Sequence, residues 1–365
     1  MVLKKLNHDY AGPLKTSGLG VDNDAHVGGT LYASNVMVNG VPIGTPFTAG
    51  KNKIINGDFF LWSRGTSFLN PTSLSYLADR WYQTYDGTGQ SVLITQQGFT
   101  YGNAIPGYEP AYYLRLSCIA SGTGGTYNGI AQRIEDVRTF AGQTVNISFW
   151  AKGDYSRSIS VYLNQNFGVA SLASTAVTNA IASPIYTTTT GWTLFTYSAT
   201  LPSISKKYIG VGSFLEVVIS ISPNIVQTID IWGIQLESGS NDTDFTTSGG
   251  SFATDSSIAQ RYYWRAGGSN AIERFGMGYA TSATNVNILV PLKSTMRVAP
   301  TSVDANSLSV YDGVTVTAVT AVALNYSSPN TVEISCTLAS GGTTLRPYVL
   351  IANSTSSYLG FSAEL

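Results

Sequence analysis

Short runs of alternating apolar and polar residues constrain the fold of this chain more than any other feature. In the segments 145–152 and 158–164 every second residue is apolar, so each segment has one apolar face and one polar face when extended. Joints rich in Gly and Thr, such as 122–125 and 187–191, separate such runs at the intervals that a two-sheet sandwich needs. The pattern therefore predicts an all-β fold, with an antiparallel β-sandwich over residues 53–245.

The composition indicates a β protein with a weakly charged surface. Of the 365 residues 43% are hydrophobic, which is enough apolar material for two or three cores. Only 11% are charged, against roughly 25% in an average soluble protein. With a net charge of -1 and no cluster of Lys and Arg, we expect no nucleic-acid binding. We also expect no membrane insertion, because Glu216 interrupts the longest apolar run, at 211–221.

The N-terminal residues and the two cysteines both indicate folding in a cytoplasm. The first ten residues turn polar too early to form the apolar core of a secretory signal. Alternation places Cys118 and Cys336 on apolar faces of two different predicted domains, so we expect two buried thiols and no disulfide.

Changes of pattern divide the chain into four predicted segments. Residues 1–50 combine short apolar pieces with Gly and Asn-Gly turn signals, which predicts a β-rich segment too small to fold without a partner. A flexible linker is the alternative for this segment. Residues 51–250 form the predicted sandwich, 251–268 a connecting helix or linker, and 269–365 a small C-terminal β domain.

A series of short motifs, taken in order, resembles a family of bacteriophage structural proteins. These motifs are Ile55-Asn-Gly-Asp-Phe59, Trp62-Ser-Arg-Gly65, Ala78-Asp-Arg-Trp81, Ser148-Phe-Trp-Ala-Lys152, Ile231-Trp-Gly-Ile-Gln-Leu-Glu237, Thr243-Asp-Phe245, Ala259-Gln-Arg-Tyr-Tyr263 and Met296-Arg-Val-Ala-Pro-Thr301. The proteins that this chain resembles are tail fibres or head fibres, in which a jelly roll similar to family 4/9 carbohydrate-binding modules precedes a small terminal domain.

The resemblance implies a structural virion protein, commonly a homotrimer. Residues 1–50 would attach it to another virion protein on the tail or the capsid, and the distal part would face the host. We expect such a fibre to be assembled in the host cytoplasm, exposed on the particle surface, and able to contact host-surface polysaccharide. A capsid decoration protein or head fibre that binds no sugar is the first alternative. A glycan-active enzyme, or its detached binding module, is the second.

Candidate glycan-binding residues lie on the polar faces of two consecutive predicted strands. Sugar recognition combines aromatic planes with amide and hydroxyl groups. Trp150 and Asn146 supply this mixture on one strand, and Tyr162 and Asn164 supply it on the next. If the two strands pair in one antiparallel sheet, Trp150 and Tyr162 become neighbours. The alternative is that this face packs under a loop or against a sister subunit.

The segment 101–110 is predicted to be a long polar loop with two candidate aromatic ligands, Tyr101 and Tyr108. It either carries recognition on the rigid scaffold or wraps a neighbouring subunit. The tryptophans of the framework motifs, Trp62, Trp81 and Trp232, are predicted to be core residues.

Nothing in the sequence supports an enzyme or a cofactor. His8 and His26 both lie in the N-terminal segment, so we predict no Ser-His-Asp triad and no His-rich metal site in the folded domains. The carboxylates available for glycoside hydrolysis, Glu135, Asp136 and Glu216, have ordinary sequence settings.

We predict that the chain binds no metal, and a structural calcium ion is the alternative. Asp58 and Asp230 would be the first ligands to consider, since calcium prefers carboxylate and carbonyl oxygens. Both residues could instead be turn or capping residues.

Overall fold

The computed structural model describes residues 36–38, 41–43, 50–102, 105–268 and 270–365. The chain divides into two compact units, Met1–Phe47 and Thr48–Leu365. In the first unit, β1 (Val36–Val38) and β2 (Val41–Ile43) pair antiparallel, with Val38 opposite Val41. The other predictions for residues 1–50, including those on the two histidines, lie outside the described residues.

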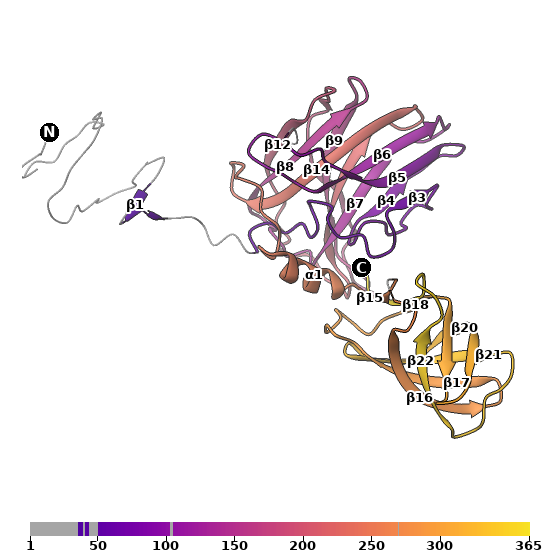
Figure 1. Ribbon diagram of the computed structural model, residues 1–365. Coiled ribbons are helices and arrows are strands. Elements are labelled where there is room, and N and C mark those ends of the chain that lie inside the picture. Colours follow the sequence, from indigo (N-terminus) through magenta and orange to yellow (C-terminus); the bar gives the residue numbers. More distant parts are fainter. Residues whose placement is uncertain (1–35, 39–40, 44–49, 103–104, 269) are drawn as a thin grey trace, which may run out of the picture. The chain divides into compact units, whose positions relative to one another are not determined.

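The second unit contains a sandwich of two antiparallel sheets (Figure 1). The first, called the β9 sheet, contains β4 (Tyr82–Tyr85), β7 (Asn128–Glu135), β9 (Ser158–Asn166), β10 (Val177–Ala182), β11 (Tyr186–Thr187) and β13 (Phe214–Ile221). The second, called the β8 sheet, contains β3 (Ser67–Leu69), β5 (Ser91–Gly98), β6 (Tyr112–Ala120), β8 (Thr144–Gly153), β12 (Thr193–Thr200) and β14 (Gln227–Ser238). The strand orders are β10-β9-β13-β7-β4, with β11 also on β9, and β12-β8-β14-β6-β5-β3.

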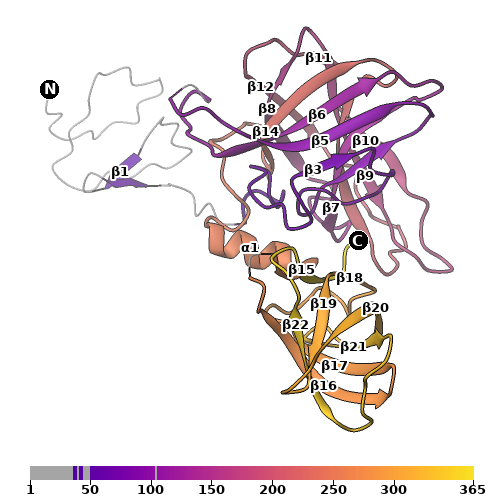
Figure 2. The same cartoon turned by 45° about the vertical axis from the view of Figure 1, so that its right-hand side comes forward.

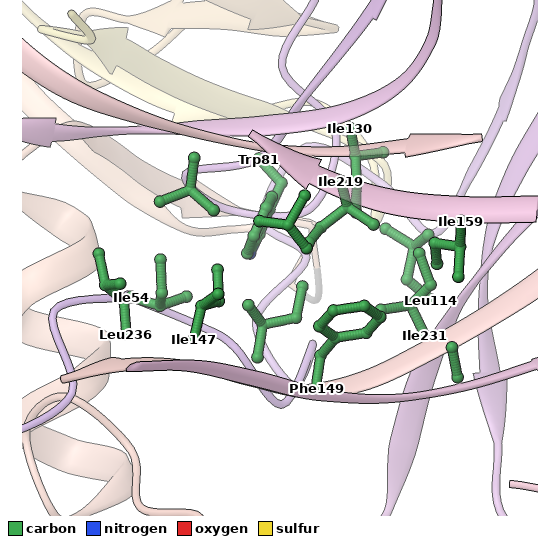
Figure 3. Packing of buried hydrophobic residues seen from close by; sticks show 14 of the residues in the cluster. Ile54, Trp81, Leu114, Ile130, Ile147, Phe149, Ile159, Ile219, Ile231 and Leu236 are labelled. Atoms are coloured by element: carbon green, nitrogen blue, oxygen red, sulfur yellow. The ribbon is translucent and has the colours of Figure 1, made fainter. Parts of the chain in front are cut away.

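The apolar faces of the two sheets pack against each other and form the larger core (Figure 3). Ile159 and Ile219 of the β9 sheet point toward Ile147 and Phe149 of the β8 sheet, and all four are at most 1% exposed. Ile147, Phe149 and Ile159 are residues that the alternation placed on an apolar face. Complete burial of such a side chain contributes roughly 1.5–3 kcal/mol, so this core is the main source of stability for the sandwich.

The framework tryptophans are buried, as predicted, but in two different clusters. Trp62 and Trp81 belong to the core between the sheets. Trp232 is 3% exposed and belongs to a separate aromatic cluster on the outer face of the β8 sheet.

The helix α1 (Phe252–Gln260) occupies only the first part of the segment 251–268, for which the sequence predicted a connecting helix or linker. The Ser251 side chain accepts a hydrogen bond from the Thr254 amide and caps the first turn, which fixes the start. Residues that were included in the predicted helix instead form β15 (Tyr263–Gly267), because β15 pairs with β23 (Tyr358–Ser362) far along the chain. Among the described residues no helix has the length and hydropathy needed to cross a membrane.

The C-terminal β domain is a closed six-stranded barrel beside a small sheet (Figure 2). The barrel order is β16 (Arg274–Ser282), β17 (Asn285–Pro291), β21 (Thr331–Leu338), β20 (Val316–Ser327), β19 (Leu308–Tyr311) and β22 (Pro347–Ala352). In the small sheet β15, β23 and β18 (Ser302–Asn306) lie side by side in that order. Cys336 lies in the barrel core and Cys118 in the sandwich core, and both are free thiols, as predicted.

Two arginines of the sandwich bind the last residues of the second unit. The Arg80 side chain is 1% exposed, donates a hydrogen bond to the Glu364 carboxylate, and lies with its guanidinium 3.5 Å from the centre of the Tyr262 ring. Arg64 donates to the other Glu364 oxygen at 3.3 Å and lies 3.6 Å from the centre of the Tyr263 ring. These stacked, charge-assisted contacts join the sandwich to the segment that follows β23.

Two further arginines complete what we call the arginine joint (Arg64, Arg80, Arg133 and Arg297). Arg297 donates to the carbonyl oxygens of Ala363 and Glu364 at 3.0 and 3.1 Å. Arg133 donates to the carbonyl oxygen of Leu365. The backbone of residues 363–365 is therefore held at three consecutive carbonyl groups.

Candidate functional site

Trp150 and Tyr162, which were predicted to be neighbours, lie on different sheets. Trp150 is on β8 and Tyr162 is on β9, and these consecutive strands belong to the two opposite sheets of the sandwich. The chain crosses between the sheets after Gly153, so β8 and β9 do not pair. The prediction of one shared site is therefore wrong, because alternation identifies the polar face of a strand without identifying the sheet that the strand joins.

Trp150 takes part in the aromatic cluster on the outer face of the β8 sheet. There Phe245 and Tyr108 pack against Trp232, with ring centroids 4.9 and 5.3 Å from that of Trp232. The Tyr108 hydroxyl also accepts a hydrogen bond of 2.8 Å from the Phe245 amide. Loop segments cover this face, which was the alternative to a binding site, and leave a cavity of about 240 Å³ beside Trp150.

Two other candidates, Asn146 and Tyr101, have no place in a shared site. Asn146 is 2% exposed, and its amide donates to the Thr196 hydroxyl at 3.0 Å on the neighbouring strand β12. Tyr101 is 82% exposed in the loop between β5 and β6.

The remaining two candidates, Tyr162 and Asn164, line a groove of about 480 Å³ on the outer face of the β9 sheet. On β13, Val218 lies opposite Tyr162 and Glu216 lies opposite Asn164. The full lining is Thr84, Thr126, Tyr127, Tyr162, Asn164, Thr178, Asn179, Glu216, Val218 and Ser220. From here on this surface is called the β9 groove.

Among the described residues that line the β9 groove, Glu216 is the only charged one, and its position is fixed by three donors. The Tyr82 hydroxyl and Arg133 Nε, the latter at 3.4 Å, donate to Oε1, and Asn164 Nδ2 donates to Oε2 at 2.8 Å. The strand β7 lies between β4, which carries Tyr82, and β13, which carries Glu216, and Ala131 of β7 is opposite Tyr82. The carboxylate is thus held in place before any ligand arrives.

Burial keeps the Tyr82 hydroxyl in its donating form. Desolvation, and then the negative charge of Glu216, raise the pKa of Tyr82 above its ordinary value. The guanidinium of Arg133 is in turn held between two rings, 5.0 Å from the centre of Tyr82 and 4.7 Å from that of Phe214.

The orientation of the Asn164 amide follows from its two partners. Its Oδ1 accepts a hydrogen bond of 2.7 Å from the Asn179 amide, so its Nδ2 is the atom that faces Glu216. One N–H of Nδ2 binds Glu216, and the other stays available. A donor and an acceptor therefore lie side by side in the β9 groove.

Sequence reasoning missed most of this groove. Glu216 was considered only as a catalytic carboxylate, although it shares a strand face with Val218 and Ser220. That alternation within 211–221 was the available signal. Tyr127 had no such signal, because it precedes β7 in a turn-rich joint.

The two candidate calcium ligands have other partners. Asp230 accepts hydrogen bonds from Arg115 Nε and Nη2 at 2.7 and 2.8 Å and lies 3.5 Å from the ammonium of Lys152. Burial, with a smaller contribution from Asp255, raises the pKa of Asp58 to about 6. Within the described part of the chain, no three His, Cys, Asp or Glu side chains are grouped so that they could hold a metal ion.

The other carboxylates considered for catalysis lie outside the β9 groove. Glu135 accepts a hydrogen bond of 3.1 Å from the Tyr262 hydroxyl, and Asp136 pairs with Arg138 at 3.0 Å.

Comparisons with known proteins find distant similarity of structure only. No family model matches this chain, and no curated protein sequence matches it. A solved structure described as a family 4 carbohydrate-binding module is 17% identical, with a TM-score of 0.32, over 50% of this chain and 98% of that chain. The enzymatically active domain of tailspike protein 4 from bacteriophage CBA120 is also 17% identical, with a TM-score of 0.31, over 52% of this chain and 22% of that chain. The C-terminal family 22 module of Clostridium thermocellum Xyn10B is 17% identical, with a TM-score of 0.31, over 45% and 89%.

Proposed function

We propose that this chain binds carbohydrate in the β9 groove. The observation that carries the proposal is the chemistry of the lining, which combines the rings of Tyr127 and Tyr162 with the amide of Asn164 and the carboxylate of Glu216. A pyranose has an apolar face that packs on an aromatic ring and a rim of hydroxyls that need donors and acceptors. A groove with a few fixed polar groups among such rings is suited to it.

Replacement of an aromatic wall tests this proposal directly. We expect Tyr162→Ala to weaken binding to an immobilised glycan panel at least tenfold, which corresponds to about 1.4 kcal/mol of lost contact with the sugar ring. Tyr101→Ala is the matched control, because Tyr101 is 82% exposed and does not line the groove. Isothermal titration with the strongest glycan of the panel gives both affinities. Equal losses in the two variants, or unchanged binding in Tyr162→Ala, would contradict a site in this groove.

We further propose that glycan binding serves adhesion of a virion to its host. In this proposal the chain is a homotrimeric phage fibre that is attached to the tail or the capsid through residues 1–50. The ordered motifs and the charged fraction of only 11% support it. Light scattering of the purified chain would give three times the monomer mass, and antibody labelling of intact particles would locate it. A capsid decoration protein would instead coat the shell and bind no member of the panel.

A further inference from the structure

The β9 groove presents one donor and one acceptor that are fixed next to each other. Asn164 Nδ2 and Glu216 Oε2 are 2.8 Å apart. Each keeps unused capacity, because Nδ2 has a second N–H and Oε2 has a further lone pair. The backbone amide of Asn179 and the hydroxyl of Tyr82 hold the pair from behind. Such a pair is complementary to a ligand with two adjacent groups of which one donates and one accepts.

We infer that the β9 groove selects uncharged pyranosides through two adjacent hydroxyl groups, and this inference rests on the proposed function. Neighbouring hydroxyls in the gauche arrangement have their oxygens about one hydrogen-bond length apart. One hydroxyl donates to Glu216 Oε2 while the next accepts from Asn164 Nδ2. Tyr162 lies two residues before Asn164 on the same strand face, where its ring borders the same part of the groove.

The charge of the lining disfavours the binding of acidic sugars. No Lys, Arg or His belongs to the described lining, and Glu216 is its only ionisable acid or base apart from tyrosine hydroxyls. Arg133 lies on the Oε1 side of Glu216 and does not line the groove. A uronate, sulfate or phosphate at hydrogen-bond distance from Oε2 therefore meets a like charge, which alone weakens its binding about fivefold in a water-like dielectric. The guanidinium of Arg133, 3.4 Å from Oε1, offsets part of this repulsion.

The inference is tested with pairs of polysaccharides that share a backbone and differ in charge. Fully methyl-esterified polygalacturonate is compared with polygalacturonate, and dextran with dextran sulfate, within a panel of neutral and acidic glycans. We expect every glycan that binds with the highest affinity to be uncharged, and we expect Tyr162→Ala to weaken that binding at least tenfold. Preference for an acidic glycan that is lost in Tyr162→Ala would overturn the inference and leave the proposed function standing. Absence of binding to the whole panel would refute the proposed function, and the inference with it.

A separate variant tests the role of Glu216. Glu216→Gln keeps the size of the side chain and an Oε1 acceptor for Tyr82, but it removes the charge and places a second donor beside Asn164. We expect at least tenfold weaker binding of the neutral glycan and less discrimination against its acidic partner. Glu109→Gln is the control, since Glu109 is an exposed carboxylate outside the groove. Unchanged affinity and discrimination in Glu216→Gln would overturn the assignment of selectivity to this residue.

Discussion

Neutralisation of Glu364 is expected to destabilise the second unit strongly, because two arginines share its carboxylate. The Glu364 side chain is 6% exposed and is shared by Arg80, which is 1% exposed, and Arg64, which is 13% exposed. In Glu364→Gln both guanidinium groups stay buried without this counter-charge. Asp79, with an oxygen 4.0 Å from Arg64, is the nearest remaining carboxylate in contact with either.

The magnitude follows from the cost of an unpaired buried charge. Burial already lowers the pKa of Arg64 and Arg80, which shows that desolvation opposes their charged forms. Removal of one partner from a buried ion pair costs about 3–5 kcal/mol. For a unit of this size, Thr48–Leu365, that corresponds to a decrease in Tm of roughly 4–8 °C. Urea unfolding followed by tryptophan fluorescence gives the free energy, and calorimetry gives Tm.

A double variant separates the ion pair from general packing. Arg80→Met with Glu364→Met removes both charges and keeps apolar volume, so it should cost less than the sum of the two single changes. Arg138→Gln is a suitable control, because its ion pair with Asp136 is largely exposed and should contribute at most about 1 kcal/mol. A loss below about 1 kcal/mol in Glu364→Gln, or strictly additive single changes, would refute the reasoning.

Two further variants test residues outside the proposed site, Asp58 and Trp150. The pKa of Asp58, raised to about 6 against an ordinary 3.8, means that the folded state holds this proton more tightly than the unfolded chain does. The contribution of Asp58 to stability is therefore present below pH 4 and is lost as the pH rises through 6. At pH 7.5 the unfolding free energy of Asp58→Asn should exceed that of the parent by about 1–3 kcal/mol, and at pH 3.5 the two should be equal. Urea unfolding at both pH values measures the difference. An equal difference at both pH values would contradict this. Trp150→Ala should lower the unfolding free energy by about 3–5 kcal/mol, because it opens the aromatic cluster, while glycan affinity stays unchanged in titration. A loss of affinity without a loss of stability would contradict this and would indicate that Trp150 belongs to the binding site.

The strands were predictable from the sequence because alternation reports the environment of each strand directly. The segments 145–152 and 158–164 lie within β8 and β9, and their apolar residues lie in the core. The partition of these strands between two sheets was not predictable. Pairing depends on partners far away in the sequence, such as β13 beside β9, and no local periodicity records them.

The candidate site shows the same limit. Tyr162 and Asn164 could be found on the polar face of one strand, but Glu216 could be assigned to the site only from the register that places it opposite Asn164. The helix boundary failed for a related reason, since Tyr263 pairs with Ser362 and leaves the helical pattern.

The motifs behind the family resemblance had a structural meaning that the sequence did not disclose. Arg64, Arg80, Tyr262 and Arg297 come from four of these motifs, and all four meet at the arginine joint. A motif that is distinctive in sequence can therefore mark the connection between two folded parts and lie outside the ligand site.

The arginine joint joins residues that are synthesised at very different times. Arg64 and Arg80 are translated 300 and 284 residues before the carboxylate that neutralises them. While the chain is still on the ribosome, the sandwich can complete its apolar core, since the N-terminal parts of a protein fold first. Until residue 364 emerges, however, Arg80 lacks its carboxylate partner and Arg64 has only Asp79, at 4.0 Å. The ion pairs of the arginine joint with Glu364 are thus formed only after the barrel has been synthesised.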